Sequence, residues 1–156
     1  MLTVLSMKEK VVKFVPQETS GLMVLPESGC NELLPQTSGS AGIDLVAAHV
    51  AVVEFGNITI IDTKAVTAIP HGFCGMVCSR SGLAAKHGIM VVNAPGIIDS
   101  DYRDTIKVIL TKVTRDPLMM TIYAGDRIAQ LLFVPVAVPD INVDKERSGG
   151  LGSTGA

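Results

Sequence analysis

The stretch VAVVEFGNITII at residues 50–61 is the segment that best defines the fold class. β-Branched residues recur on both sides of Phe55-Gly56-Asn57, a composition typical of a turn between two strands. Similar short runs lie at residues 10–15, 64–69, 75–79, 105–113 and 128–138, with turn-forming residues at 70–72 and 115–117. Many short strands with regular turns predict an all-β sandwich or barrel.

One stretch, SGLAAKHG at residues 81–88, has the composition of a helix. Good helix formers near residues 83–87 are preceded by Ser81, which we expect to cap the helix, and are followed by Gly88, which ends it. Residues 26–40 are polar and predict a surface loop. The domain organisation we expect is a single β domain over residues 1–143 and a flexible tail over residues 144–156.

Overall composition limits the possible partners of the chain. A formal net charge of −2 over 156 residues gives no electrostatic reason to bind bulk nucleic acid. The mean hydropathy of +0.42 has two open explanations, a rich core or apolar surface buried against other copies of the chain. The longest apolar run, residues 131–138, contains Pro135 and is too short for a bilayer, so no membrane association is expected.

Cysteine usage and the N-terminal residues predict an intracellular location. Cys30, Cys74 and Cys78 are odd in number and lack the paired spacing of a zinc site. No basic segment followed by a long apolar segment begins the chain, so no signal peptide is expected. The expected setting is the cytoplasm, or the nucleus in a eukaryote.

Residues 93–104 form the first candidate for chemistry. Two apolar runs flank Asp99-Ser100-Asp101, and this pattern predicts a hairpin whose backbone groups can pair with a flat polar ring. A carboxylate fixed at Asp99 can orient and deprotonate a water molecule. An exposed Tyr102 can stack on a sugar. The alternative is that these aspartates only form a turn.

Four further segments have both a binding and a structural interpretation. Arg80-Ser81-Gly82 at a helix start suits a phosphate, or is a simple cap with a surface arginine. In Gly125-Asp126-Arg127-Ile128-Ala129-Gln130, a turn enters a strand; Gln130 can donate to a phosphate, or Asp126 and Arg127 can form a structural ion pair. The tail from Arg147 to Gly155 can clamp phosphates, or is disordered. Asp44, in the segment at 41–45, can cap a turn or support a metal-bound water.

The order of these five segments is similar to the five ordered motifs of the trimeric dUTPase family, from about Lys10 to the last residue. The resemblance implies a jelly-roll-like β-barrel or sandwich, a homotrimer with three active sites at subunit junctions, and a tail that closes over an active site. It implies hydrolysis of dUTP to dUMP and pyrophosphate, which limits uracil incorporation into DNA and supplies dUMP for dTMP synthesis. It also implies Mg²⁺ held mainly by the triphosphate.

Residue roles follow from the same resemblance. Asp99 is implied as the base that activates the water attacking the α-phosphorus. The implied supporting residues are Asp101, Lys86 and Asp44, the last through a metal-bound water. Leu151 stands where the family usually has an aromatic residue over the uracil. The implied substrate-binding residues are Arg80, Ser81, Gly82, Asn93, Gly96, Ile98, Tyr102, Gln130, Arg147, Leu151, Gly152, Ser153 and Thr154.

Two other hypotheses remain open from sequence. One is the related dCTP deaminase, which shares the fold but needs an additional acid–base residue near the base ring, and no clear candidate lies at residues 94–102. The other is a non-catalytic trimeric β scaffold that binds nucleotide without turnover. Asp99, Tyr102 and Gln130 favour the hydrolase over both.

Overall fold

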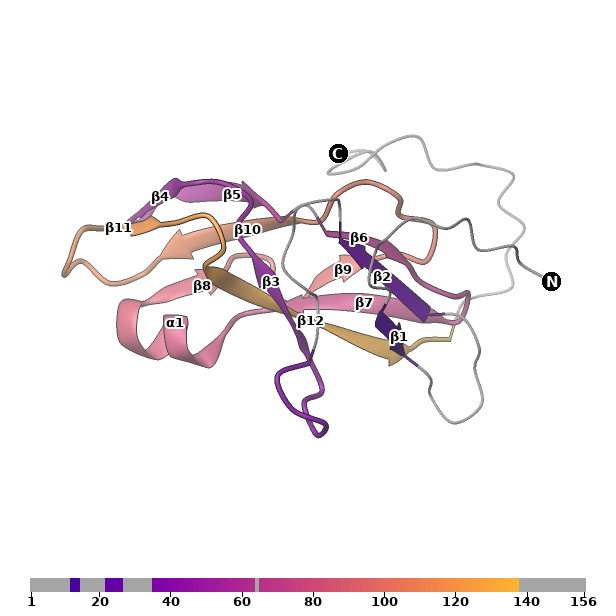
Figure 1. The fold of residues 1–156 in the computed structure, drawn as a ribbon. Coiled ribbons are helices and arrows are strands. Elements are labelled where there is room, and N and C mark those ends of the chain that lie inside the picture. Colours follow the sequence, from indigo (N-terminus) through magenta and orange to yellow (C-terminus); the bar gives the residue numbers. More distant parts are fainter. Residues whose placement is uncertain (1–11, 15–21, 27–34, 64, 138–156) are drawn as a thin grey trace.

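The computed structural model describes residues 12–14, 22–26, 35–63 and 65–137, the first two segments by their backbone only (Figure 1). Strands dominate these residues, and one short helix interrupts them. The elements in chain order are β1 (Val12–Phe14), β2 (Leu22–Pro26), β3 (Ile43–Val46), β4 (Ala51–Glu54), β5 (Ile58–Asp62), β6 (Ala65–Ala68), β7 (Phe73–Cys78), α1 (Ser81–His87), β8 (Ile89–Val91), β9 (Gly96–Ile98), β10 (Lys107–Lys112), β11 (Met119–Ile122) and β12 (Arg127–Pro135).

The strands form four small antiparallel sheets. Their orders are β3-β12-β7-β9, β5-β10-β8, β1-β2-β6 and β11-β4. Neighbours in space come from distant parts of the chain, as in a jelly roll, and the predicted all-β class with one short helix is confirmed for the described residues. Within those residues, no helix has the length and apolar character needed to cross a membrane.

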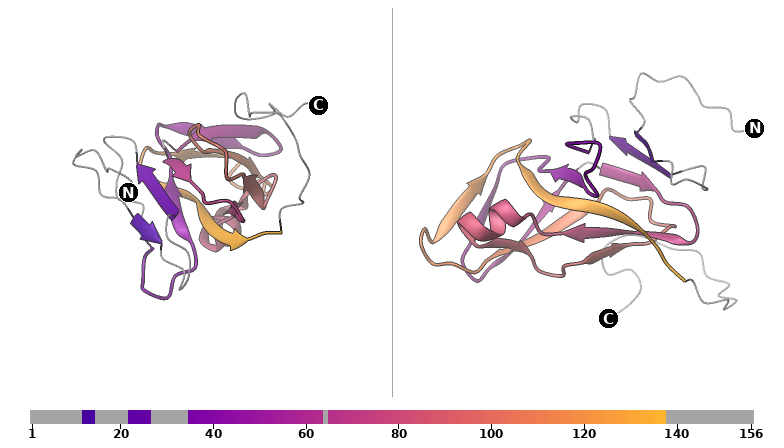
Figure 2. Two further views of the ribbon diagram at one scale, coloured as in Figure 1. Left: turned by 90° about the vertical axis from the view of Figure 1, so that its right-hand side faces the viewer. Right: turned by 90° about the horizontal axis from the view of Figure 1, so that it is seen from below.

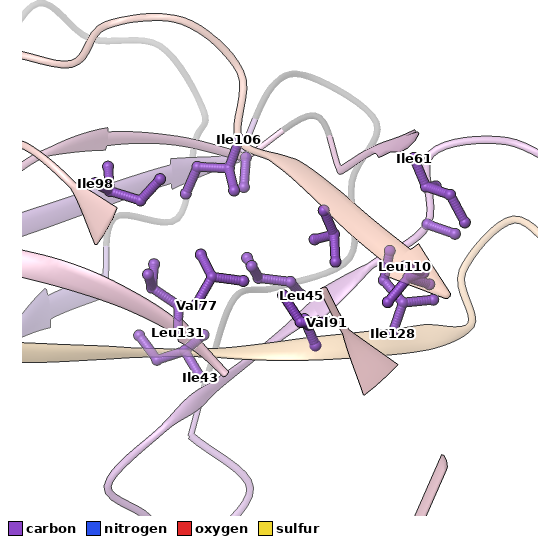
Figure 3. Close-up of a cluster of buried hydrophobic side chains, with 14 of the residues drawn as sticks. Ile43, Leu45, Ile61, Val77, Val91, Ile98, Ile106, Leu110, Ile128 and Leu131 are labelled. Carbon is purple, nitrogen blue, oxygen red and sulfur yellow. The ribbon is translucent and has the colours of Figure 1, made fainter. Parts of the chain in front are cut away.

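The core lies between the sheet that contains β12 and the sheet that contains β10 (Figures 2 and 3). Strand alternation explains which side chains enter it, because every second residue points to the same side. Leu45, Leu110 and Leu131 are fully buried members from three strands. The hairpin predicted around Phe55-Gly56-Asn57 is confirmed as β4 and β5, with Gly56 at a φ of 75° in the connecting turn.

The short helix α1 is confirmed, with two corrections at its N-terminus. It begins at Ser81 rather than near residue 83, and Arg80 is the N-cap residue with no side-chain capping hydrogen bond, so Ser81 does not cap it. Gly88 ends α1 as predicted, at a φ of 61° in the left-handed region. A Cβ on Gly88 would lie 2.5 Å from the side chain of Thr114, so both backbone and space require glycine there.

The predicted hairpin over residues 93–104 is wrong. Its first apolar arm becomes β9, which pairs with β7, whereas the second becomes β10, which pairs with β5 and β8. The Asp99-Ser100-Asp101 turn therefore joins two different sheets. The expected exposure of Tyr102 is also wrong, because the side chain is buried in the core and its hydroxyl donates to the carbonyl of Thr105 at 2.9 Å.

Lys112 is a lysine with no exposed surface at the C-terminal end of α1. Its Nζ donates to the carbonyl of His87 at 2.5 Å and to Oγ1 of Thr114 at 2.6 Å. The hydroxyl of Thr114 donates to the same carbonyl at 3.0 Å. A cation at the negative end of a helix satisfies carbonyls that have no partner in the helix itself. Lys112 thereby fixes α1 to β10.

We expect Lys112→Ala to lower the free energy of unfolding by about 2–4 kcal/mol, because it leaves a cavity and removes a donor from the partly buried carbonyl of His87. Urea denaturation followed by circular dichroism measures the change. Lys107→Ala is the matched control on the same strand, since Lys107 is exposed, and it should cost less than about 0.5 kcal/mol. Equal losses in the two variants would show that Lys112 is not an anchor.

Candidate active site

A pocket of about 420 Å³ lies beside the outer face of the β3-β12-β7-β9 sheet, next to the start of α1. We call it the Asp44 pocket. Strand register creates it, because Gln130 on β12 is paired with Asp44 on β3 and with Cys78 on β7. Its lining residues are Gln36, Ser40, Ala41, Gly42, Asp44, Cys78, Arg80, Ser81, Gly82, Arg127, Gln130 and Leu132.

Asp44 is held between two guanidinium groups in this pocket. Arg80 Nε donates to Oδ1 of Asp44 at 3.0 Å, and Arg127 Nη1 donates to Oδ2 at 3.3 Å. Arg80 Nη1 also donates to the backbone carbonyl of Arg127 at 3.0 Å. Two positive charges against one negative charge leave the pocket with a net positive charge, which suits a phosphate chain.

Gln130 is fixed against the floor of the pocket by two neighbours. Its Nε2 donates to the carbonyl of Ser79 at 3.0 Å, and its Oε1 would lie 3.1 Å from a Cβ placed on Gly42. Gly42 therefore leaves room for the amide. Ser81 and Gly82 are exposed at the start of α1 and line the same pocket. The sequence prediction that Ser81, Gly82 and Gln130 belong to one site with Asp44 and Arg80 is consistent with this geometry.

Residues 93–102, which we call the Asp99 turn, form a second group. The Asp99 side chain is exposed, and Ile98 next to it pairs with Gly75 on β7. A Cβ on Gly96 would lie 3.1 Å from Nδ2 of Asn93, so the absence of a side chain at Gly96 lets the Asn93 amide approach the backbone. Ile98 points into the core, and only its backbone is available to a ligand.

The negative charge of Asp99 also acts on the buried thiol of Cys74. Cys74 precedes Gly75 on β7 and Asp99 follows Ile98 on β9, so the antiparallel pairing of Gly75 with Ile98 brings the two residues near each other. Burial raises the pKa of the Cys74 thiol, and the negative charge of Asp99 raises it further. Cys74 and Cys78 are both free, as predicted for this strand.

Within the described residues, the Asp44 pocket and the Asp99 turn have no residue in common and lie at different registers of β7. Ile98 pairs with Gly75 and Gln130 with Cys78, on opposite sides of β7. Three residues of strand separate these registers, a distance of about 10 Å. The Asp44 pocket contains no residue of the Asp99 turn.

The two predicted supporting residues besides Asp44 are both exposed. Asp101 lies within the Asp99 turn, whereas Lys86 lies on α1 and does not line the Asp44 pocket. The predicted tail residues lie outside the described residues, as does the predicted domain boundary at 143. Those tail residues are Arg147, Leu151, Gly152, Ser153 and Thr154.

Arg127 lines the Asp44 pocket but was not among the predicted site residues. The predicted structural pair between Asp126 and Arg127 is wrong, because Asp126 Oδ2 accepts from the backbone N–H of Tyr123 at 2.8 Å and Arg127 pairs with Asp44. In a regular strand, residues three apart point to opposite faces. A register shift between Arg127 and Ala129 brings Arg127 to the same side as Gln130. Gln36 and Ser40 also line the pocket and were not predicted.

A protein-family model and curated relatives match the sequence of this chain. The family model described as dUTPase matches residues 15–155. A deoxyuridine 5′-triphosphate nucleotidohydrolase of Cutibacterium acnes is 41% identical over 142 residues, covering 85% of this chain and 92% of that protein. A second deoxyuridine 5′-triphosphate nucleotidohydrolase, from Wolbachia pipientis subsp. Culex pipiens, is 47% identical over 131 residues, covering 76% of this chain and 83% of that protein. The chain belongs to the dUTPase family.

Solved structures show the same fold. A mutant dUTPase from phage phi11 of S. aureus, described with a structural Mg(II) ion, has a TM-score of 0.69 at 22% identity, covering 80% of this chain and 97% of that one. A mutant dUTPase of Staphylococcus bacteriophage 80alpha with dUpNHpp has a TM-score of 0.70 at 24% identity, covering 88% and 100%. At this level of identity the likeness concerns the fold, and it agrees with the predicted jelly-roll class.

We expect Asp99→Asn to speed alkylation of Cys74, because removing the negative charge lowers the pKa of the thiol and increases the thiolate fraction at a given pH. The background carries Cys30→Ser and Cys78→Ser, so that Cys74 is the single thiol. Iodoacetamide labelling between pH 7 and 10, followed by mass spectrometry, should show a higher labelling rate of Cys74 in the variant than in the parent.

Asp101→Asn in the same background is the matched control, since it removes a carboxylate from the same turn that does not act on Cys74. Its labelling rate should equal that of the parent. Identical rates for Asp99→Asn and the parent would contradict the placement of Asp99 beside Cys74.

Proposed function

We propose that the protein hydrolyses dUTP to dUMP and pyrophosphate. Membership of the dUTPase family supports this activity, and relatives at 41–47% identity carry the name deoxyuridine 5′-triphosphate nucleotidohydrolase. The observation that carries the proposal is the Asp44 pocket, in which Arg80, Arg127, Ser81 and Gln130 offer positive charge and donors to a phosphate chain. The cellular consequence would be less uracil in DNA and a supply of dUMP.

The phosphate chain would bind in the Asp44 pocket. Arg80 is held by two hydrogen bonds, to Asp44 and to the carbonyl of Arg127, and its other N–H donors are available for phosphate oxygens. Gln130 is fixed by Ser79, and one of its amide hydrogens is free to donate within the described residues. Phosphoryl transfer depends on placement and charge neutralisation more than on covalent participation, and fixed donors supply both.

The Asp99 turn would bind the nucleoside, and its Asp99 carboxylate would act as the general base of the reaction. Uracil presents two carbonyls and one N–H, a pattern that the Asn93 amide and the backbone near Gly96 and Ile98 can complement. Cytosine would leave unpaired donors, at a cost of about 1–3 kcal/mol for each buried group. The exposed carboxylate of Asp99 can take a proton from a water that attacks the α-phosphorus. Tyr102 is 7% exposed, so little of its side chain is available to pack under the sugar.

Mg²⁺ is part of the proposal as a companion of the substrate. The described residues contain no group of three or more His, Cys, Asp or Glu side chains that could hold a metal ion. Asp44 is already neutralised by two arginines. This donor set fits a cation bound through the phosphate oxygens, with Asp44 contributing through water. Such a cation would supply further positive charge to the triphosphate.

A homotrimer with shared sites completes the proposal. Two observations support it: the described lining of the Asp44 pocket includes no residue of the Asp99 turn, and several large apolar side chains are exposed. Ile58 and Ile60 on β5 and Met90 on β8 are exposed on the outer face of one sheet, and Val92 follows them toward Asn93. Association of copies would bury this surface and bring the Asp99 turn of one subunit to the Asp44 pocket of another.

The substrate preference is tested by pyrophosphate release from dUTP, dTTP, dCTP and UTP with purified protein and Mg²⁺. We expect strong preference for dUTP, and Asp99→Asn should lower kcat by several orders of magnitude with little change in nucleotide affinity. Equal rates on all four nucleotides would refute dUTP specificity, and uracil nucleotide formed from dCTP would support a deaminase. Binding of dUTP with no turnover would support a scaffold.

The shared site is tested by mixing two inactive variants. Asp99→Asn damages the turn and Arg80→Ala damages the pocket, so each homotrimer lacks a complete site. When both chains are co-expressed and trimers that contain both are isolated by tandem-tag purification, each mixed trimer should have one functional site of three, because a site needs an intact pocket and an intact turn from two neighbouring chains. Activity per mixed trimer should therefore be about one third of the wild-type value.

Native mass spectrometry of the mixed sample confirms that mixed trimers form, which separates failed mixing from failed sharing. As the matched control, Asp99→Asn mixed with an Asp99→Ala chain should show no recovery, because no chain supplies an intact turn. Mixed trimers without activity would place the whole site within one chain.

A further inference from the structure

Ser79 is the single residue between the end of β7 and Arg80, the N-cap residue of α1. Its two oxygen atoms accept hydrogen bonds from different parts of the fold. The backbone carbonyl accepts from Nε2 of Gln130 at 3.0 Å, whereas the side-chain Oγ accepts from the backbone N–H of Val91 at 2.9 Å. Ser79 therefore connects the Asp44 pocket, through Gln130, with strand β8, through Val91.

Val91 lies at a free edge of its sheet. Among the described strands β8 pairs with β10 alone, and Val91 stands opposite Leu110 there. The next residue, Val92, donates its N–H to the carbonyl of Ile109 at 2.8 Å, so the antiparallel alternation turns the polar groups of Val91 away from β10. Val91 is buried, and a buried N–H requires an acceptor. The Ser79 hydroxyl is the acceptor that the structure supplies.

Val91 is also the first residue of the turn that carries Asn93. The Val91 carbonyl accepts from the N–H of Ala94 at 3.4 Å, which closes residues 91–94 into a turn. Asn93 is the third residue of this turn, and its Nδ2 would lie 3.1 Å from a Cβ placed on Gly96. A shift of Val91 would therefore carry the Asn93 amide with it and change its position against β9.

We propose that Ser79 is a positioning residue for nucleoside binding, whose hydroxyl fixes Val91 and thereby holds the Asn93 amide where it can pair with the base. This inference rests on the proposed dUTP hydrolysis, in which Asn93 reads uracil. Ser79 does not line the Asp44 pocket, so it acts through its neighbours. Its two oxygens have separate tasks: the hydroxyl serves the base and the carbonyl holds Gln130. Prior placement of a binding group lowers the cost of ordering it when the ligand arrives.

Ser79→Ala separates these two tasks, because it removes the hydroxyl and leaves the carbonyl. In calorimetric titration, affinity for dUMP should fall about three- to tenfold, since the turn has lost one of its anchors. Affinity for Mg²⁺-pyrophosphate, which has no base, should equal that of the wild type. An equal fall for both ligands would show a general disturbance of the fold and overturn the proposal.

Ser79→Thr and Ser79→Val separate the hydroxyl from the shape of the side chain. Threonine and valine have similar shapes, and of the two only threonine carries a hydroxyl. The Thr variant should bind dUMP as the wild type does, and the Val variant should match Ser79→Ala. Equal dUMP affinity in the Thr and Val variants would refute a role of the hydroxyl, and this comparison holds even if Ser79→Ala is too unstable to measure.

Thr59→Ala is the matched control. Thr59 lies on β5, in the same sheet as β8, and its hydroxyl donates to the carbonyl of Val52 at 3.0 Å. The variant therefore also loses one hydrogen bond between a hydroxyl and the backbone, but away from the turn at residues 91–94. Its dUMP affinity should equal that of the wild type. A loss as large as that of Ser79→Ala would contradict a specific role of Ser79.

A double-mutant cycle tests whether Ser79 acts through Asn93. Asn93→Ala removes the amide, so adding Ser79→Ala should cost no further dUMP affinity, because the group that Ser79 holds is absent. Two losses that multiply would show that Ser79 acts elsewhere and would overturn the proposal.

Hydrogen exchange and turnover complete the test. Exchange in a peptide that spans residues 89–94 should be faster in Ser79→Ala, and kcat/KM for dUTP should fall by the same factor as the dUMP affinity. Faster exchange with unchanged dUMP affinity would reduce Ser79 to a structural support. A chain that loses dUMP affinity in Ser79→Ala but never cleaves dUTP would support the positioning role and refute only the enzyme activity.

Discussion

Strand β7 is the constraint on which both parts of the candidate site depend, because it is hydrogen-bonded on both edges, to β12 and to β9. One edge sets the register of Gln130 and, through it, of Asp44 on β3. The other edge sets the register of Ile98 and hence of Asp99. The continuation of β7 through Ser79 leads directly into Arg80 and α1. A slip of one residue would turn each of these side chains to the opposite face.

Electrostatics in the site follow from how few acidic groups enter the Asp44 pocket. A single carboxylate at 14% side-chain exposure faces two guanidiniums, so the pocket stays positive although the whole chain carries a net charge of −2. The other important carboxylate, Asp99, lies on the far register of β7, beside the Cys74 thiol. The cationic pocket and the Asp99 carboxylate thus lie at different registers of β7 in the described part of the chain.

The sequence predicted the strands and the short helix better than it predicted which strands pair and which side chains are buried. Alternating β-branched runs and the Gly56 turn identified β4 and β5, and Gly88 identified the end of α1, because these depend on local backbone preferences. The hairpin at residues 93–104 was predicted wrongly, because both arms alternate equally well whether they pair with each other or with β7 and β10. The burial of Tyr102 and of Lys112 likewise depends on neighbours far along the chain.

The sequence by itself determined the all-β class, the short helix and the five ordered segments that identify the dUTPase family, since these require only residue types and their spacing. Tertiary structure alone decided that Arg127 leaves Asp126 and joins Asp44 and Arg80. The physical reason is the bulge at the start of β12, which turns Arg127 to the face opposite the one that a regular strand would give it. The alternation of apolar and polar residues along this strand does not predict the bulge. It also decided that Asp99 and the pocket lie at separate registers of β7, because long-range pairing, and not local preference, sets strand order.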